Sequence, residues 1–272
     1  DGVRADVDYL FLQPSVTEPV VSLTQNCGNL LAGVAQFAIE RGLLTVAPTA
    51  AEARVRILMV NTDSVATATF PVAAGRPVYS GATAISGVPG TAARVRLDFE
   101  QIAGSTCGAL LPTGNPVDTI DGVPVTLVDN GMPVIVLAAA AVGLTGYEPP
   151  AEIEADTALK ARLESIRLQA GPLMNLGDVT LASVPKITLA APPRDGGTLS
   201  TRTLIPHRVH DAIGVLGAVS VATAALLDGT PANTVLEPAV RAAAAAGGEV
   251  VVAVEHPTGT FDAALTVAVG PG

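Results

Sequence analysis

Tryptophan is absent from this chain of 272 residues, and aromatic residues make up only 3% of it. Hydrophobic residues nevertheless account for 49% of the sequence. The core must therefore be built from Val, Ala, Leu and Ile, while 27 glycines and 21 prolines imply many turns. This composition favours a β-rich or mixed α/β fold over a helical bundle, and the length predicts two domains.

Basic residues are scarce, with 15 Lys and Arg against 25 Asp and Glu, which gives a formal charge of −10. Since the sequence has no basic run, we expect neither nucleic acid nor a membrane surface as a partner. The longest apolar run, Ala212 to Leu227, is too short for a membrane span and is typical of a buried helix. Two cysteines do not make a disulfide framework, and a cytoplasmic location is the simplest interpretation.

Several chemistries lack their sequence signals. The chain has no phosphate-binding loop, dinucleotide fingerprint, Gly-x-Ser-x-Gly elbow or Cys-x-x-Cys pair. His207 and His210 could present two imidazoles to a metal, but only Asp211 and His256 are candidates for further ligands. We therefore expect no metal and no cofactor.

The segment from Asn26 to Gly42 contains a run, Leu30 to Ile39, that is apolar on every side apart from Gln36. This pattern predicts a helix enclosed by other structure rather than a surface helix. Cys27 falls at the helix start, where unpaired N–H groups stabilise a thiolate and can bind a carboxylate. The alternative is a small cysteine that only fills space.

The second half repeats this organisation. Pro206 to Asp211 leads into the apolar run Ala212 to Leu227, which places His210 at the predicted helix start. Strand patterns surround both apolar helices, and a loop at Ala103 to Pro116 separates the halves, so we predict domains at 1–116 and 117–272. The strand patterns cover 7–13, 20–24, 54–60, 65–71, 93–99, 123–128, 132–138, 184–189, 200–205, 249–255 and 261–269, and 151–170 reads as one exposed helix. The two helix starts are expected to face each other across an interdomain cleft.

Acid/base and anion-binding groups are the chemistry that remains. They comprise Cys27, His210, Lys186, Arg202, His207 and Arg208, together with backbone N–H groups from Cys27 to Asn29. A thiol or lysine that titrates near neutrality can move a carbon-bound proton, and fixed donors can stabilise the resulting enolate. These residues indicate proton transfer next to a carbonyl or carboxylate.

Long motifs in the chain resemble the 2-methylaconitate cis-trans isomerase family. They are Asn26-Cys27-Gly28-Asn29 with the apolar run that follows, Cys107 to Asn115, Asp129 to Pro133, Met174 to Asp178, Val184 to Lys186, Ile205 to Val219 and Glu255 to Gly259. The resemblance covers nearly the whole chain. It implies a diaminopimelate epimerase-like α/β (α+β) fold, with two pseudo-symmetric domains that each curl a β-sheet around a central apolar helix.

The implied reaction is a cofactor-independent 1,3-proton shift that interconverts the keto and enol forms of 4-oxalomesaconate, a step of gallate breakdown. By resemblance, Cys27 is the catalytic cysteine, His210 handles protons or binds substrate, and Cys107 is at most close to the cleft. The expected substrate-binding residues are Asn26, Gly28, Asn29, Thr113, Gly114, Asn115, Lys186, Arg202 and His207. The partner is a small tricarboxylate, with a homodimer as one possible assembly.

Two alternatives stay open: isomerisation of methylaconitate, aconitate or methylitaconate, and a noncatalytic tricarboxylate-binding homologue. The family usually has a Met-Arg-Gly-Gly-Thr-Ser segment, a Ser-Lys segment whose lysine is the second base, and a final Arg-Thr-Ala-Arg stretch. This sequence contains none of them, so it looks truncated at both ends. If this chain is the whole molecule, we expect an incompletely wrapped first helix and weak or no tautomerase activity.

Overall fold

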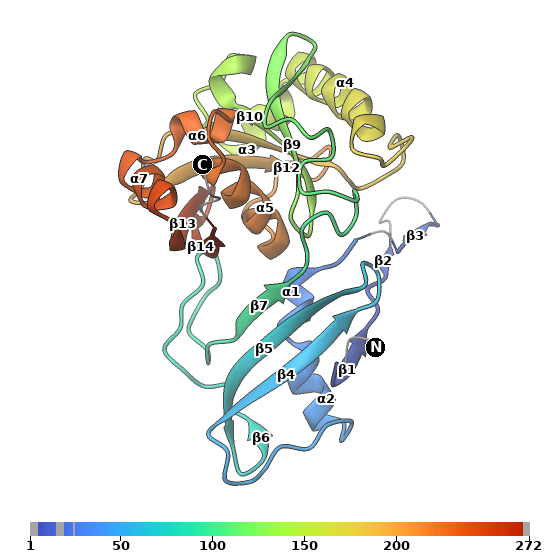
Figure 1. Cartoon of the computed structure of the whole chain (residues 1–272), viewed down its shortest axis with the longest axis vertical. Helices are drawn as coiled ribbons and strands as arrows, with labels where there is room; N and C mark the ends of the chain where they lie inside the picture. The colour runs from blue at the N-terminus through green and yellow to red at the C-terminus, as the bar shows by residue number, and fades with distance from the viewer. Residues whose placement is uncertain (1–4, 15–18, 24, 269–272) are drawn as a thin grey trace. The chain divides into compact units, whose positions relative to one another are not determined.

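The computed structural model describes residues 5–14, 19–23 and 25–268. The chain divides into two compact units, Asp1–Ser105 and Thr106–Gly272 (Figure 1). The sequence predicted the division at 116/117 instead. The earlier position has a local cause, since the backbone N–H groups of Thr106 and Cys107 donate to the Asp129 carboxylate at 2.8 and 2.7 Å and so attach this loop to the second unit.

The first unit is a mixed sheet with short helices on one face. In the sheet, β1 pairs in parallel with β4, and β5 pairs antiparallel with β4, β6 and β7, while β2 and β3 form a separate pair. The elements are β1 (Val7–Tyr9), β2 (Gln13–Pro14), β3 (Val21–Ser22), α1 (Gly28–Leu31), α2 (Val34–Glu40), β4 (Glu52–Met59), β5 (Ser64–Ala73), β6 (Arg76–Pro77) and β7 (Arg96–Glu100).

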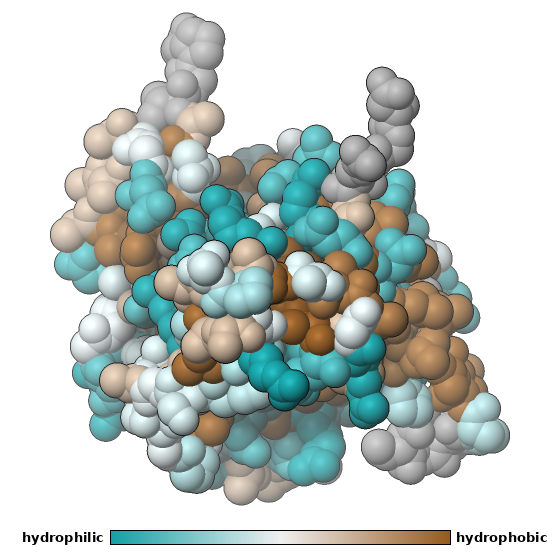
Figure 2. Space-filling model, turned by 90° about the horizontal axis from the view of Figure 1, so that it is seen from below, coloured by the Kyte–Doolittle hydropathy of each residue, from teal (hydrophilic) through white to brown (hydrophobic). Residues whose placement is uncertain are grey.

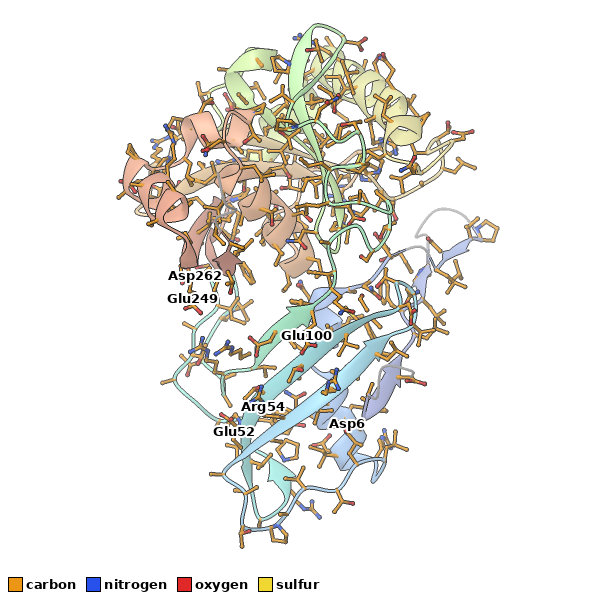
Figure 3. All side chains as sticks on the ribbon, viewed as in Figure 1. Asp6, Glu52, Arg54, Glu100, Glu249 and Asp262 are labelled. Atoms are coloured by element: carbon orange, nitrogen blue, oxygen red, sulfur yellow. The ribbon has the colours of Figure 1, made fainter. Side chains whose placement is uncertain are left out.

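Strand β4 shows how alternation in sequence gives this sheet two different faces. Ala53, Val55 and Ile57 are buried, and the inner face to which they belong packs against α2. The outer face is charged: Glu52 and Arg54 are labelled in Figure 3, and the Arg56 guanidinium lies 3.8 Å from the carboxylate of Glu100 on β7. The outer face of the sheet is therefore solvated.

The first apolar helix differs from the expectation of a single enclosed helix. It is broken at Ala32 and Gly33 into α1 and α2. Leu31, Ala35 and Ala38 are buried, but Leu30 and Phe37 are 61% and 53% exposed. Figure 2 shows hydrophobic residues between hydrophilic ones on the face of the molecule seen from below. This helix is thus incompletely wrapped within the described part of the chain.

The second unit is larger and contains a seven-stranded sheet in the order β14-β13-β12-β11-β10-β9-β8. The pairs β10–β11 and β12–β13 are parallel, and the others are antiparallel. The elements are β8 (Asp118–Ile120), β9 (Val123–Asp129), β10 (Pro133–Ala138), η1 (Ala139–Val142), α3 (Pro150–Ala155), α4 (Thr157–Leu173), β11 (Lys186–Ala191), β12 (Leu199–Leu204), α5 (Val215–Leu226), α6 (Pro231–Val235), α7 (Pro238–Ala246), β13 (Gly248–His256) and β14 (Gly259–Val267).

This sheet curls around α5, as the sequence predicted for the second apolar helix. Strands from both ends of the sheet, β9 and β10 as well as β13 and β14, contact α5, and Leu216, Val221 and Ala225 on it are buried. The opposite face of the sheet packs on α4 through a cluster that includes Leu163 and Ile166 (Figure 1). The curled sheet therefore forms the middle layer between α5 and α4.

Two helix boundaries differ from the sequence prediction. The exposed helix expected over 151–170 is two helices, because Asp156 leaves helical geometry and its side chain accepts the amide hydrogen of Leu159 as the N-cap of α4. Helix α5 begins at Val215 rather than Ala212. The segment from His210 to Gly214 therefore lies before the helix.

Candidate functional site

Cys27 lies at the start of the first helix pair. It is the N-cap residue of α1, it is partly exposed, and its thiol is free. Its carbonyl oxygen accepts the amide hydrogen of Leu31 at 3.0 Å and faces the Tyr9 hydroxyl at 3.4 Å. Because α1 has only four residues, the N-terminal field at the thiol is weaker than the long helix expected from the sequence would supply.

Tyr9 reaches Cys27 from β1. Burial, and then the charge of Cys27, raise the pKa of Tyr9 to about 12. The phenol therefore keeps its proton at neutral pH and remains a donor. Its 3.4 Å distance to the Cys27 carbonyl oxygen is long for an O–H···O bond, so the contact orients the loop rather than holding it tightly.

A buried polar network supports the residue before the thiol. The Asn26 side-chain amide donates to the Thr62 hydroxyl at 2.6 Å, which lies 2.7 Å from the Ser64 hydroxyl. Over the described ranges, the carbonyl oxygens of the Gln25 and Asn26 side chains are buried without a hydrogen-bond partner. Acceptors of this kind can receive a hydrogen bond from a donor brought by a ligand.

The other members of the Asn26–Asn29 motif differ in exposure. Gly28 is buried as the first residue of α1, and Asn29 is exposed. A surface depression of the first unit lies at the other end of α2, beside Glu40 and Arg76, and none of the predicted site residues lines it. The candidate chemistry of this unit is thus concentrated at Cys27 and Asn26.

The second unit gathers basic side chains at the end of its sheet. Lys186 begins β11, His256 ends β13, and the backbone N–H of His210 donates to the carbonyl oxygen of Thr203 on β12 at 2.8 Å. Burial lowers the pKa of His210, and the charge of Lys186 lowers it further. The charge of Asp211 raises it, but by less. His210 is therefore neutral at pH 7.

The hydrogen bonding of His210 also fixes its tautomer. Nδ1 accepts the backbone N–H of Ala212 at 2.9 Å, so the proton of the neutral ring is on Nε2. The sequence placed this residue at the start of the long helix, but α5 begins five residues later, at Val215. His210 is therefore oriented by its own loop and by β12, not by the N–H groups of α5.

His207 does not join this cluster. Its side chain is 56% exposed, and Nδ1 lies 3.5 Å from the Glu164 carboxylate on α4. His207 therefore lies beside α4, and the substrate-binding role predicted for it stays a prediction. In the part of the chain that the structure describes, no group of three or more His, Cys, Asp or Glu side chains could hold a metal ion.

The predicted substrate-binding residues Thr113, Gly114 and Asn115 form a turn that closes on itself. The Thr113 hydroxyl and the Asn115 amide donate to the two oxygens of Asp118 at 2.7 and 2.9 Å. Gly114 has a φ of 76°, which a glycine adopts without strain. The two side chains stabilise the loop before β8, and their contact with substrate stays a prediction.

Arg202 is buried and largely committed to the protein. Its Nε donates to the carbonyl oxygen of Glu148 at 2.7 Å and its Nη1 to that of Thr201 at 2.8 Å. Burial lowers its pKa. Its charge still acts on the cluster, because it is one of the groups that lower the pKa of His256. We therefore interpret Arg202 as an electrostatic neighbour of the cluster.

Cys107 belongs to the hydrophobic core of the second unit, with 2% of its surface exposed. Burial raises the pKa of its thiol, and the nearby carboxylate of Asp129 raises it further. Asp129 is itself buried, and desolvation raises its pKa although it accepts hydrogen bonds from Thr106 and Cys107. Cys107 is therefore a packed thiol, whereas Cys27 is the accessible one.

Sequence reasoning missed Tyr9 and Thr62 in the first unit, and it considered His256 only as a metal ligand. Tyr9 and Thr62 are far from Cys27 in sequence and carry no motif, so no local signal identifies them. His256 could have been found as a reactive group at a strand end, since the chain has only three histidines.

The second unit has the predicted sheet curled around an apolar helix, and the groups at Cys27 and at His210 are of the kind that move protons or bind anions. The family model described as PrpF protein matches residues 2–270, and the chain belongs to this family. The crystal structure of methylitaconate-delta-isomerase covers 95% of this chain and 70% of its own, with a TM-score of 0.80 and 31% identity. The expected diaminopimelate epimerase-like fold is thereby confirmed.

Two relatives are more similar in sequence. The (4E)-oxalomesaconate Delta-isomerase of Novosphingobium sp. strain KA1 is 55% identical over 262 residues, which are 96% of this chain and 71% of that protein. The 4-oxalomesaconate tautomerase of Pseudomonas putida strain KT2440 is 54% identical over 263 residues, which are 97% of this chain and 71% of that protein. These relatives confirm the family resemblance and the isomerase class. None of the helices in the described ranges is long and apolar enough to cross a membrane.

Proposed function

We propose that this protein interconverts the keto and enol forms of 4-oxalomesaconate by a 1,3-proton shift that needs no cofactor. The observation that carries the proposal is the 54–55% identity, over nearly the whole chain, to relatives named for isomerisation or tautomerisation of this acid. The accessible thiol of Cys27 supplies the group that such a reaction requires.

In the proposed reaction Cys27 acts as the proton-transferring group. The thiolate takes a proton from the carbon between the ketone and the carbon–carbon double bond, and the electron pair of the broken C–H bond moves onto the ketone oxygen. The enolate oxygen takes a proton from water, and the Cys27 thiol gives the proton that came from carbon back to water, which yields the enol and restores the thiolate. The Asn26 network holds the Cys27 loop and Tyr9 orients it while the charge shifts.

Lys186 and His210 are the groups of the second unit that we assign to substrate carboxylates. Lys186 supplies positive charge, and the neutral His210 ring presents its Nε2–H as a donor. Both roles rest on the arrangement inside the second unit. They are consistent with a small polycarboxylate as the ligand.

Proton exchange from heavy water into 4-oxalomesaconate, followed by NMR, tests the role of Cys27. We expect Cys27→Ser to slow exchange by about 100-fold or more, because the serine hydroxyl is a much weaker acid than a thiol. Cys107→Ser makes the same chemical change at the buried thiol and is expected to retain exchange. If Cys27→Ser exchanges at the wild-type rate, the thiol has no part in the reaction.

Methylitaconate, methylaconitate and aconitate are the alternative substrates within the isomerase class. The 31% identical methylitaconate-delta-isomerase shares the fold, so the fold does not separate these acids. Parallel measurements of kcat/KM on 4-oxalomesaconate and on each of the three alternatives decide between them. We expect the largest value for 4-oxalomesaconate.

Binding without turnover is a second candidate function. The open face of α1 and α2, with Leu30 and Phe37 exposed, favours it, because a proton-transfer site usually excludes water. Thermal stabilisation by 4-oxalomesaconate without isotope exchange would support this alternative. Stabilisation together with exchange would support the isomerase.

A further inference from the structure

We propose that His256 takes up a proton when a polycarboxylate binds beside Lys186 and His210, so that anion binding by the second unit is coupled to protonation. The choice of ligand rests on the proposed function. His256 is the last residue of β13 and is 8% exposed. It is a positioning residue, because it acts through its charge and through the loop that carries His210.

The hydrogen bonds around His256 provide acceptors for an imidazolium. The Thr258 hydroxyl donates its single hydrogen to the carbonyl oxygen of Asp211 at 2.8 Å, so towards Nδ1 of His256, 3.2 Å away, it can only accept. The carbonyl groups of Thr260 and Asp211 also lie at the ring and favour its protonated form. The amide of Thr258, 3.3 Å from Nδ1, fits the neutral ring instead.

His256 is nevertheless neutral in the free protein. Burial lowers its pKa most, and the positive charges of Arg202 and of a protonated His210 ring would lower it further, against the two carbonyl groups. Among the described residues, the environment of His256 thus has acceptors for a second ring proton, whereas no carboxylate raises its pKa.

The elements described around His256 show why no carboxylate raises its pKa. Lys186 on β11 and Arg202 on β12 are cationic, and α5 has no charged residue. The Glu255 carboxylate accepts backbone N–H groups of the loop from Arg194 to Gly197 at 2.6–3.0 Å. Asp211 is exposed, and its charge raises the pKa of His210 by less than burial and Lys186 lower it. A bound polycarboxylate would provide the missing charge.

His210 is the poorer acceptor of the incoming proton. Its Nδ1 already accepts the Ala212 N–H at 2.9 Å, and protonation there would break this bond. The same bond keeps Nε2–H available as a donor to a carboxylate. We therefore assign the contact with the anion to His210 and Lys186, and the proton to His256.

Histidine NMR gives a direct test, because the chain has three histidines and one of them, His207, lies outside the cluster. The probe is propane-1,2,3-tricarboxylate. At pH 7 we expect its addition to move the ring signals of His256 towards those of an imidazolium while those of His207 stay in place. Signals of His256 that remain those of a neutral ring at saturation would overturn the proposal, as would failure of the probe to bind at pH 6.

Calorimetry in buffers of different ionisation enthalpy measures the protons taken up on binding. We expect uptake of up to one proton and about tenfold tighter binding at pH 6 than at pH 8, because a one-unit pKa change corresponds to tenfold in binding. His256→Gln should remove both effects, and the matched control His207→Gln should retain them. Uptake that survives in a folded His256→Gln protein would refute the assignment.

Failure of this inference is distinguishable from failure of the proposed function. Cys27→Ser should lose isotope exchange and still show proton uptake with the tricarboxylate. If the wild-type protein takes up the proton but shows no exchange, the anion site stands and the isomerase proposal fails. If it shows exchange but takes up no proton, the isomerase proposal stands and the role of His256 is refuted.

Discussion

Replacement of Ser220 by Ala is expected to destabilise the second unit by about 2 kcal/mol. Ser220 is fully buried on α5 and makes two hydrogen bonds to the turn between β9 and β10. Its hydroxyl accepts the Asn130 N–H at 3.1 Å and donates to the Met132 carbonyl oxygen at 2.7 Å. Each such bond is worth about 1 kcal/mol net, and the groups left unpaired add about 1 kcal/mol or more. The better helix propensity of Ala recovers roughly 0.5 kcal/mol.

Urea unfolding followed by hydrogen exchange and mass spectrometry measures this effect. Peptides from β9, β10 and α5 report on the second unit, and peptides from β4 and β5 provide the internal reference. Thr223→Ser is the matched control, because it keeps the hydroxyl that accepts the Asn130 side-chain amide at 2.8 Å. A loss below about 0.5 kcal/mol for Ser220→Ala would show that the turn is not held by this hydroxyl.

Two other predictions concern a buried acid and an exposed aromatic residue. Burial raises the pKa of Asp129 above its unfolded value, so its stabilising effect is present below the unfolded pKa and is lost as pH rises through the folded pKa. Asp129→Asn should therefore reduce the fall in stability of the second unit as pH rises above the ordinary carboxyl pKa of 3.8 in urea unfolding, and an unchanged fall would contradict this. Phe37→Ser should cost less than about 1 kcal/mol, whereas Ile39→Ala should cost about 2–4 kcal/mol because Ile39 is in the core. Equal costs in the same assay would show that the outer face of α2 is covered.

Strand alternation and turn chemistry made most of the fold predictable. Strands β4, β5 and β7 coincide with the patterns at 54–60, 65–71 and 93–99 to within a few residues. The turn Asp129-Asn130-Gly131 joins β9 to β10 as expected. Thr24, at the end of the predicted strand 20–24, and residues 269 onwards lie outside the described residues. These successes are local, because period and turn residues act over a few neighbouring positions.

The predicted site residues were harder to place, since nearby positions in one motif can face different neighbours. His207 and His210 are three residues apart, yet His207 lies beside Glu164 on α4 and His210 beside Thr203 on β12. Arg202 looks like an anion ligand in the sequence, but its Nε and Nη1 donate to backbone carbonyl groups. Sequence spacing does not specify these contacts, because they depend on which strand or helix packs beside each side chain.

The two apolar helices show the same limit and bear on the chemistry of Cys27. Both runs are apolar on nearly every side, but α5 contacts strands from both ends of a seven-stranded sheet, whereas the main strand contacts of α2 in the described residues are with β1, β4 and β6. How completely a helix is enclosed thus depends on how many strands pack around it. The apolar pattern of the helix sequence does not predict that number. Cys27 begins the less covered pair and is partly exposed, so in the proposed mechanism its proton can exchange with water between turnovers. When the enol returns to the keto form, the hydrogen added to carbon should therefore come from the solvent. It should not be the hydrogen that was removed from the same molecule.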